Sequence, residues 1–442
     1  MAAVKAPEVS YVPHIPKKII SSGKLSDVQL ESIVRAGQAH QVTLPDGTRK
    51  GYFIGDGTGV GKGAQVAGII IDNIAQGRKK AVWVSENQKL FEDAKRDLHW
   101  VGGNIKKLFK HSMVKGDIKA NDGVMFTTYD TLRSKGKDIK DAKGEIVTPG
   151  KQRLDQIIDW LGADFDGVIA FDEAHNMANA LDQKGTRGTK KASMKALAGI
   201  DLQKRLPNAR IIYVSATGAT EVENLGYAER LGLWGEGTPF ADKSTFVNEI
   251  KAGGVAAMEV VAKDLKSMGV YTSRSLSYDD VEYSTIEHVL TDNQRFTYDE
   301  LATAWQVVLE NVNDALEATG AVTESQTNGA AKSAAYSAFW GSHQRFFNQV
   351  LTGMQMPSVI DDVEKQLEND KSVVMQLVNT NEAVQERRMN QAADAGITLD
   401  EVDITPRDIL MQYVNNAFPV NQYEEYTDDD GNVRSRPAMD SQ

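Results

Sequence analysis

One segment of nine residues, GDGTGVGKG at positions 55–63, constrains the fold of this chain more than any other. It follows a short apolar run at 52–54 and precedes a helical pattern that begins at Lys62. In a glycine-rich loop between a strand and a helix, backbone N–H groups turn inward and the helix N-terminus adds a positive dipole end. The segment therefore favours phosphate binding, with Lys62 placed to reach the β- and γ-phosphates of a nucleotide.

The loop departs at two positions from the usual P-loop pattern, G-x-x-x-x-G-K-[ST]. Asp56 stands at the first glycine, and Gly63 replaces the serine or threonine that normally contacts magnesium. The dinucleotide pattern G-x-G-x-x-G does not fit, because every frame of the segment lacks its last glycine. The remaining alternative is a glycine-rich turn with an exposed lysine.

Short apolar runs alternate with helical patterns between residues 25 and 225. The runs are rich in valine and isoleucine and lack polar alternation, which is typical of parallel strands covered on both faces. We therefore predict an α/β fold built on a doubly wound parallel sheet. Its strands are expected at 52–54, 81–85, 123–129, 167–173 and 210–216, and its helices at 25–39, 62–75, 90–100, 153–161 and 192–205.

The length of 442 residues exceeds the roughly 250–300 residues that one core usually organises, so we expect more than one domain. A region rich in alanine, glutamate and asparagine follows the α/β domain, and one strong strand pattern at 372–380 then restarts the alternation. The final residues are acidic and expected to be disordered. The predicted division is an extended lead-in at 1–24, the α/β domain at 25–240, a mainly helical insert at 241–365, the beginning of a second α/β domain at 366–420 and the acidic tail at 421–442.

Two acidic residues stand at the end of the predicted strand 167–173, in the sequence FDEAH. In open α/β sheets, ligands bind at the carboxyl ends of the strands. Asp172 is suited to hold Mg²⁺ through water, and Glu173 to orient or deprotonate an attacking water. The alternative is a helix N-cap with a favourable dipole interaction.

Two further motifs are too short to indicate a function by themselves, and only their positions relative to the predicted strands and helices make them informative. The sequence SAT at 215–217 follows the next predicted strand, where Ser215 and Thr217 can bridge the acidic motif and a bound nucleic acid. Gln29 lies on the first predicted helix, and its amide can donate and accept at once, as an adenine edge requires. A solvent-facing glutamine is the alternative reading of that position.

In chain order, these motifs resemble those of the first RecA-like domain of a superfamily 2 helicase or translocase. Longer segments resemble the strawberry notch family of helicase-like ATPases, among them SATGATEVENLGYAERLGLWGEGTPF at 215–240, GGVAAMEVVAKDLKSMGVYTSRSLS at 253–277 and FWGSHQRFF at 339–347. The resemblance covers about residues 11–420. In that family a glycine also follows the P-loop lysine, so Gly63 resembles a family trait.

The resemblance implies a P-loop RecA-like fold that binds ATP and Mg²⁺ and acts on nucleic acid. It implies catalytic roles for Lys62, Asp172, Glu173 and His175, a metal contact at Asp172, coupling through Ser215 and Thr217, and nucleic-acid contacts at Ser85, Thr127 and Thr128. It implies nucleotide binding at Gln29, Asp56, Gly57, Thr58, Gly59, Val60, Gly61, Lys62 and Gly63. With no hydroxyl at position 63, either Thr58 or water would complete the metal shell.

The carboxyl-terminal part departs from the superfamily pattern. Such enzymes close a second RecA-like domain over the nucleotide and insert arginines from a Q-x-x-G-R-x-x-R-like motif. The sequence contains no such motif, and its nearest arginine pair, Arg387 and Arg388, lacks the glycine. Two hypotheses follow: a motor domain that needs a second RecA-like half, for example on a partner chain, or a catalytically silent nucleotide-binding scaffold.

Charge and composition limit the partners. The net charge of -11 excludes a uniformly basic nucleic-acid coat, but residues 103–153 carry twelve lysines and arginines against six acids. We therefore expect a local nucleic-acid contact, with DNA favoured over RNA.

The absence of cysteine excludes disulfides and thiolate metal sites. No membrane span or export signal is indicated, so a cytoplasmic location is expected, and the resemblance favours a prokaryotic or phage source.

Overall fold

The structure, a computed structural model, describes most of the chain between residues 4 and 438. The residues outside the description are 1–3, 103–107, 115, 136–138, 141–145, 149, 186–187, 218–224, 278, 280, 323–327, 378–404, 428–432 and 439–442. The chain forms two compact units, residues 1–280 and 281–442, each with its own hydrophobic core. The first unit holds the strand–loop–helix segments predicted from the sequence, and the described part of the second is mainly helical.

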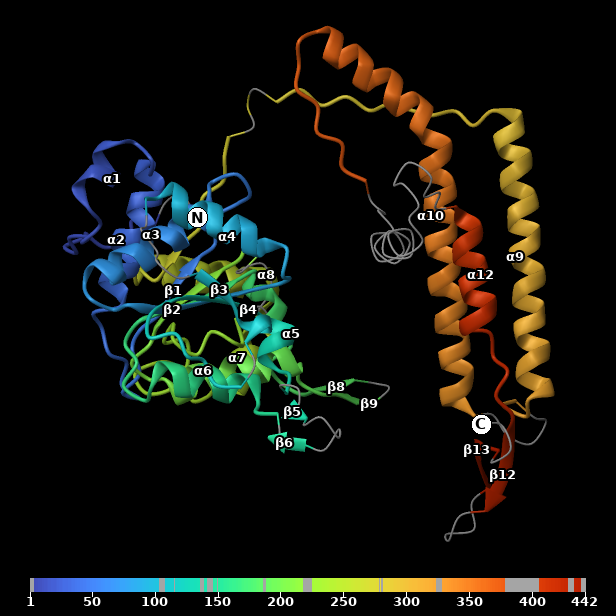
Figure 1. Cartoon of the computed structure of the whole chain (residues 1–442), viewed down its shortest axis with the longest axis horizontal. Helices are drawn as coiled ribbons and strands as arrows, with labels where there is room; N and C mark the ends of the chain where they lie inside the picture. The colour runs from blue at the N-terminus through green and yellow to red at the C-terminus, as the bar shows by residue number, and fades with distance from the viewer. Residues whose placement is uncertain are drawn as a thin grey trace. The chain divides into compact units, whose positions relative to one another are not determined.

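The core of the first unit is a seven-stranded sheet in which all neighbouring strands are parallel (Figure 1). The strand order is β11-β1-β10-β7-β2-β4-β3. The central strands are buried on both faces, as their unbroken apolar runs require, so the predicted α/β fold is confirmed. The strands are β1 (Tyr52–Ile54), β2 (Lys80–Ser85), β3 (Leu108–Lys110), β4 (Gly123–Thr128), β7 (Val168–Asp172), β10 (Arg210–Val214) and β11 (Tyr271–Thr272).

Helices cover both faces of this sheet, as a doubly wound fold requires. Figure 1 shows α2, α3 and α4 on one face and α5, α6 and α7 on the other. Three of the helices have the predicted bounds, because their apolar spacing and flanking turns mark both ends. The helices are α1 (Lys17–Ser21), α2 (Asp27–Ala39), α3 (Lys62–Ala75), α4 (Leu90–Trp100), α5 (Tyr129–Leu132), α6 (Arg153–Leu161) and α7 (Met194–Arg205), with 3₁₀ turns η1 (His111–Met113) and η2 (Ala174–Met177).

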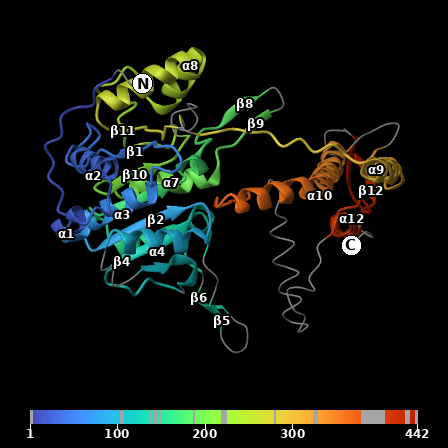
Figure 2. The same cartoon turned by 90° about the horizontal axis from the view of Figure 1, so that it is seen from above.

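The first unit extends beyond the predicted domain end at residue 240. Helix α8 (Lys243–Ser267) follows, and β11 then joins the edge of the sheet beside β1 (Figure 2). The pairing continues past β1, because the N–H of Gly55 donates to the carbonyl of Thr272 at 2.7 Å. The beginning of the predicted helical insert therefore belongs to the α/β unit, and the second unit starts at residue 281.

Two short antiparallel strand pairs accompany the sheet. They are β5 (Ile139–Lys140) with β6 (Ile146–Thr148), and β8 (Gln183–Gly185) with β9 (Gly188–Lys190). The first pair lies within the basic stretch 103–153, which falls partly outside the described residues. The nucleic-acid contact expected of that stretch stays a prediction.

Long helices and aromatic side chains build the described part of the second unit. Trp305 of α9 contacts Phe339 and Phe346 of α10, with ring centroids 5.5 and 5.3 Å apart. Tyr413 of α12 packs on the same tryptophan at 6.1 Å. The helices are α9 (Asp292–Ala318), α10 (Gly329–Glu368) and α12 (Pro406–Asn416). In the described part of the chain, no helix has both the length and the apolar character needed to cross a membrane.

The beginning of a second α/β domain predicted at 366–420 has no counterpart in the described residues. Residues 371–377 form no strand, and the rest of the predicted strand lies outside the description. Helix α12, which falls within that range, packs its Ile409 and Tyr413 into the aromatic core of the second unit.

The acidic tail, predicted to be disordered, contains an antiparallel strand pair. Strand β12 (Tyr423–Thr427) pairs with β13 (Val433–Pro437). Cross-strand contacts support the pairing, because Arg436 forms an ion pair with Glu424 at 2.7 Å and lies over the ring of Tyr426 at 5.0 Å. The acidic surplus alone does not indicate these cross-strand contacts.

Substitutions of two adjacent aromatic residues, one buried and one exposed, can test which side chains form the core of the second unit. Phe339 is 1% exposed and Trp340 is 48% exposed. We expect Phe339→Ala to lower the free energy of unfolding of this unit by about 3–5 kcal/mol, because it leaves a cavity. Trp340→Ala, the matched control, should cost less than about 1 kcal/mol. Denaturant unfolding followed by circular dichroism measures both, and equal effects would contradict this assignment of the core.

Candidate nucleotide-binding site

The glycine-rich loop joins β1 to α3 at the carboxyl edge of the sheet. Gly59 and Gly61 have φ angles of 90° and 84°, which glycine adopts without strain. A side chain at Gly61 would overlap the amide of Gln29, and one at Gly59 would meet Leu276 at 2.7 Å. The backbone conformation therefore favours glycine at these two positions, and a larger residue would also displace the ends of the Gln29 and Leu276 side chains.

Lys62 is the first residue of α3, and its ammonium lies against the loop. Its Nζ donates to the carbonyl oxygens of Asp56 at 3.1 Å and of Gly57 at 3.4 Å. Thr58 and Gly59 beside it are exposed. The lysine is therefore held at the loop by weak contacts with carbonyl groups, which a phosphate oxygen can replace.

Gln29 lies on α2 and uses both ends of its amide within the protein. Its Nε2 donates to the carbonyl of Val60 at 3.2 Å. Its Oε1 accepts from the N–H of Ser26 at 3.0 Å, in a capping box that begins α2. The structure thus brings Gln29 to the loop, and its contact with adenine stays a prediction.

Asp56, which stands at the first-glycine position, is fully buried. Its carboxylate accepts from the guanidinium of Arg274, from Nε at 3.0 Å and from Nη2 at 2.6 Å. Gln65 of α3 donates to the same carboxylate at 2.9 Å. The sequence did not reveal Arg274, because it lies 218 residues from Asp56 and no local spacing marks the pair.

Two other predicted nucleotide contacts have unexpected neighbours. The N–H of Gly57 donates to the carbonyl of Arg274 at 2.7 Å, so this amide does not face into the loop in the structure. A side chain at Gly63 would overlap the carboxylate of Asp97 on α4. Burial raises the pKa of Asp97. The motif did not indicate this carboxylate, which fills the space that a serine or threonine side chain would need.

Asp172 ends β7 with its carboxylate buried against the neighbouring strand β2. Its Oδ2 accepts from Ser85 Oγ at 3.1 Å and from the indole N–H of Trp83 at 3.3 Å. Burial, reinforced by the charge of Glu173, raises the pKa of Asp172 to about 6. An acid that is costly to ionise in the free protein is suited to bind a cation, which would compensate its charge.

Glu173 begins a chain of polar contacts that leads to the next strand. It adopts a left-handed backbone conformation with φ of 47°, which turns the chain sharply at the sheet edge. His175 Nδ1 lies 3.3 Å from Glu173 Oε2 and 3.3 Å from Ser215 Oγ. Ser215 Oγ lies 3.3 Å from Thr217 Oγ1. The acidic motif and the SAT motif are therefore joined through His175.

Strand register explains why these motifs meet. Ile54, the last residue of β1, is level with Val214 of β10, which is level with Asp172 of β7. The chain leaves each strand at the same edge, so the loop, Ser215 and the acidic pair follow one another across three neighbouring strands. The predicted catalytic residues thus share one sheet edge.

The three residues predicted to contact nucleic acid are buried. Ser85 bonds to Asp172, as described above, and Thr127 Oγ1 lies 3.1 Å from His111 Nδ1. Thr128 caps α5 by accepting from the N–H of Thr131 at 3.1 Å. In this conformation each of these hydroxyls bonds to another group of the same domain. Their contact with nucleic acid stays a prediction.

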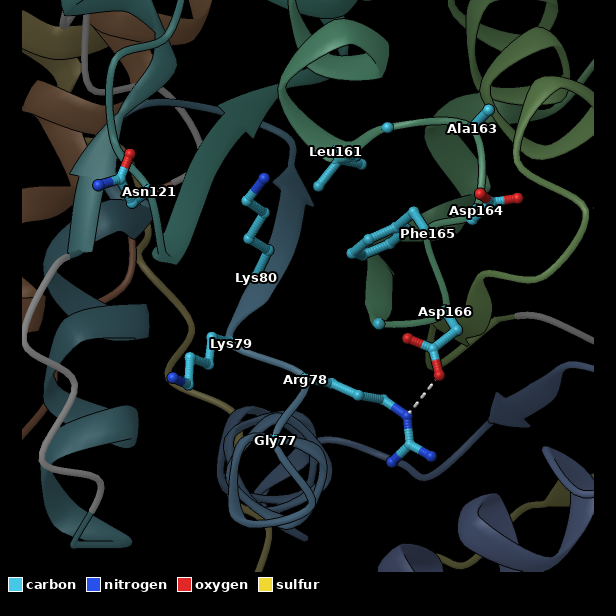
Figure 3. Close-up of a pocket in the computed structure, with 12 residues that line it drawn as sticks. Gly77, Arg78, Lys79, Lys80, Asn121, Leu161, Ala163, Asp164, Phe165 and Asp166 are labelled. Atoms are coloured by element: carbon cyan, nitrogen blue, oxygen red, sulfur yellow. Dashed lines mark hydrogen bonds and ion pairs between the residues drawn. The ribbon is translucent and has the colours of Figure 1, made fainter.

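A pocket of about 530 Å³ lies near the start of β2 and β7, away from the motifs (Figure 3). Two of its cationic side chains, those of Arg78 and Lys80, have partners in the protein. Arg78 forms an ion pair with Asp166 at 2.9 Å, and Lys80 Nζ donates to the carbonyl of Trp160 at 2.5 Å. The pocket contains none of the predicted site residues, so we assign the candidate site to the carboxyl edge of the sheet.

The raised pKa of Asp172 predicts a specific pH dependence of stability. The folded protein holds this proton up to about pH 6, whereas the unfolded chain releases it near pH 3.8. The contribution of Asp172 to stability therefore falls as pH rises from about 4 to 6, by about 3 kcal/mol in total. We expect the free energy of unfolding of the wild type minus that of Asp172→Asn to show this fall in denaturant titrations. A difference that stays constant from pH 4 to 7 would contradict the assignment.

Sequence comparisons identify the family. The model described as P-loop containing NTP hydrolase pore-1 matches residues 1–300. Protein FORGETTER 1 of Arabidopsis thaliana is 35% identical over 440 residues, covering 98% of this chain and 32% of the relative. Protein strawberry notch homolog 1 of Homo sapiens is 36% identical over 432 residues, covering 95% and 29%. The chain therefore spans about a third of the length of these relatives, which are eukaryotic and give no support to the predicted prokaryotic or phage source.

Solved structures show weaker likeness. The Sulfolobus solfataricus SWI2/SNF2 ATPase core in complex with dsDNA has 14% identity and a TM-score of 0.40, covering 94% of this chain and 79% of that one. Dbp5 of S. cerevisiae bound to RNA and ADP BeF3 has 15% identity and a TM-score of 0.35, covering 67% and 59%. At these levels the fold assignment rests on the observed parallel sheet and on the family model. The chain belongs to the strawberry notch family, within the P-loop-containing NTP hydrolases.

Proposed function

We propose that the chain is the ATP-binding motor domain of a superfamily 2 helicase-like enzyme, which couples ATP hydrolysis to movement on nucleic acid or to its remodelling. One observation carries the proposal. The loop with Lys62 and the acidic pair Asp172 and Glu173 stand at the same sheet edge, with Ser215 between them. This is the arrangement that phosphoryl transfer needs, with a phosphate cradle on one side and carboxylates for metal and water on the other.

Each side chain has a chemical task in this proposal. Lys62 exchanges its contacts with loop carbonyls for contacts with the β- and γ-phosphates. Glu173 orients and deprotonates the attacking water, and His175 links it to Ser215. Positioning of these groups is most of what such an enzyme contributes, since the phosphoryl transfer itself needs little covalent help from protein.

The residues present also fit Mg²⁺, which would neutralise charge on the transferred phosphate. Among the described residues, no group of three or more His, Asp or Glu side chains could hold a metal. Mg²⁺ is commonly bound by one or two carboxylates together with phosphate oxygens and water, so a full protein shell is not needed. Asp172 would supply one carboxylate. We propose that Asp97, whose carboxylate lies beside Gly63, supplies the oxygen that a P-loop hydroxyl usually gives.

We extend the proposal to the partners. The order of motifs favours a nucleic acid as partner, with DNA preferred over RNA. A cytoplasmic location is a separate part of the proposal and does not follow from the motifs. A second RecA-like half would supply the arginines that stabilise the transferring phosphate. Because the chain spans about a third of its relatives' length, that half is expected either elsewhere in a longer protein or on a partner chain.

ATP binding and turnover by the whole chain test this function, with and without single-stranded DNA, double-stranded DNA or RNA. We expect Lys62→Ala to weaken ATP binding at least about tenfold, because the charge facing the phosphates is lost. Glu173→Gln should bind ATP normally and lose turnover by about a hundredfold or more. Lys17→Ala, an exposed lysine on α1, is the control and should behave as the wild type.

The outcomes separate the proposal from its alternative. ATP binding that Lys62→Ala leaves unchanged would contradict the assigned site. Tight binding without turnover, even after addition of a second RecA-like half and DNA or RNA, would favour the catalytically silent scaffold.

A further inference from the structure

Arg274 is a partly buried arginine that the proposed chemistry does not use. Its guanidinium forms a fork on the buried carboxylate of Asp56, with Nε at 3.0 Å from Oδ1 and Nη2 at 2.6 Å from Oδ2. The backbone N–H of Arg274 also donates to Asp56 Oδ1, at 3.0 Å. Such a two-pronged, charge-assisted contact fixes both distance and orientation. The first residues of the loop are therefore held by a partner from a distant part of the chain.

The same side chain also reaches α2. Its Nη1 donates to Glu31 Oε2 at 3.0 Å and to the carbonyl of Val28 at 2.7 Å, and Nη2 contacts Ser32. Protein groups thus engage all three guanidinium nitrogens. Arg274 is directed at Asp56 and α2, so in this arrangement it acts through other residues and does not contact phosphate itself.

The segment that carries Arg274 lies along the loop. The N–H of Gly57 donates to the Arg274 carbonyl, and the side chain of Leu276 lies close to Gly59. This segment follows β11 and leads toward the second unit, which starts at residue 281. The loop is therefore bonded to the stretch of chain through which the two units are connected.

The ordinary P-loop pattern has no need of such a partner, because a glycine at its first position buries no charge. In this chain a buried aspartate takes that position, and a buried carboxylate requires a cation and hydrogen-bond donors. Arg274 supplies the cation and Gln65 a further donor. The aspartate that replaces the first glycine of the P-loop pattern is thus one partner of a buried ion pair, and Arg274 is the other.

We propose that Arg274 is a positioning residue of the nucleotide site: its ion pair with Asp56 holds the phosphate-binding loop in the shape that ATP binding requires, and links that loop to the segment leading into the second unit. This inference rests on the function proposed above.

A double-mutant cycle on the whole chain tests the inference, with Mg²⁺-dependent ATP affinity and thermal unfolding measured for each variant. We expect Arg274→Met and Asp56→Asn each to weaken ATP binding at least about tenfold at a temperature where circular dichroism shows them folded. Because the two side chains act as a unit, the double variant should bind no more than about threefold more weakly than the worse single variant.

Arg35→Met is the matched control. Arg35 also lies on α2, where it pairs with Glu31 at 2.7 Å and donates to the carbonyl of Pro7, and neither contact involves the loop. We expect this variant to lose stability with less than about a twofold change in ATP affinity. A merely structural role for Arg274 would give the same pattern as Arg35.

Four results would overturn the inference. They are wild-type ATP affinity in folded Arg274→Met, wild-type affinity in Asp56→Asn, losses in the two single variants that multiply in the double variant, and an equal loss of affinity in Arg35→Met. If Arg274→Met does not fold, the isosteric Asp56→Asn decides the question alone. If the wild type itself does not bind ATP, the proposed function fails together with this inference. If the wild type binds ATP and the variants bind it equally well, only this inference fails.

Discussion

Parallel pairing of β1, β10 and β7 in a single register holds the candidate site together. Each of these strands delivers its following residues to the same edge of the sheet, so groups more than a hundred residues apart in sequence become neighbours. The strands are buried on both faces, and their apolar side chains fix that register. The loop, the acidic pair and the SAT motif thus depend on the core for their common position.

Two departures from the P-loop pattern have physical partners in the fold. Asp56 replaces a glycine and is neutralised by Arg274, while Gly63 replaces a hydroxyl residue and leaves room for Asp97. Both partners are charged side chains that burial would penalise if they stood alone. The loop is therefore a variant P-loop. Arg274, after β11, balances the charge of Asp56, and Asp97 of α4 occupies the space beside Gly63.

The sequence predicts the α/β sheet correctly, because unbroken apolar runs are local signals. The roles of the motif residues stay predictions. The sequence placed the end of the first unit too early, since β11 is only two residues long and becomes a strand by pairing with β1. It did not reveal Arg274 or Asp97, whose roles arise from contacts across the fold. Charge alone predicts a disordered tail at 421–442, whereas its described residues form a strand pair with cross-strand contacts such as that of Arg436 with Glu424.

Hydrogen exchange of the whole chain, with and without Mg²⁺ and ATP, tests the central claim most directly. If the carboxyl edge of the sheet binds the nucleotide, exchange should slow in peptides that cover residues 55–66 and 270–277. Exchange in α6, on the opposite face of the sheet, should stay the same. Unchanged exchange at 55–66 together with protection around the pocket lined by Arg78 and Asp166 would contradict the account.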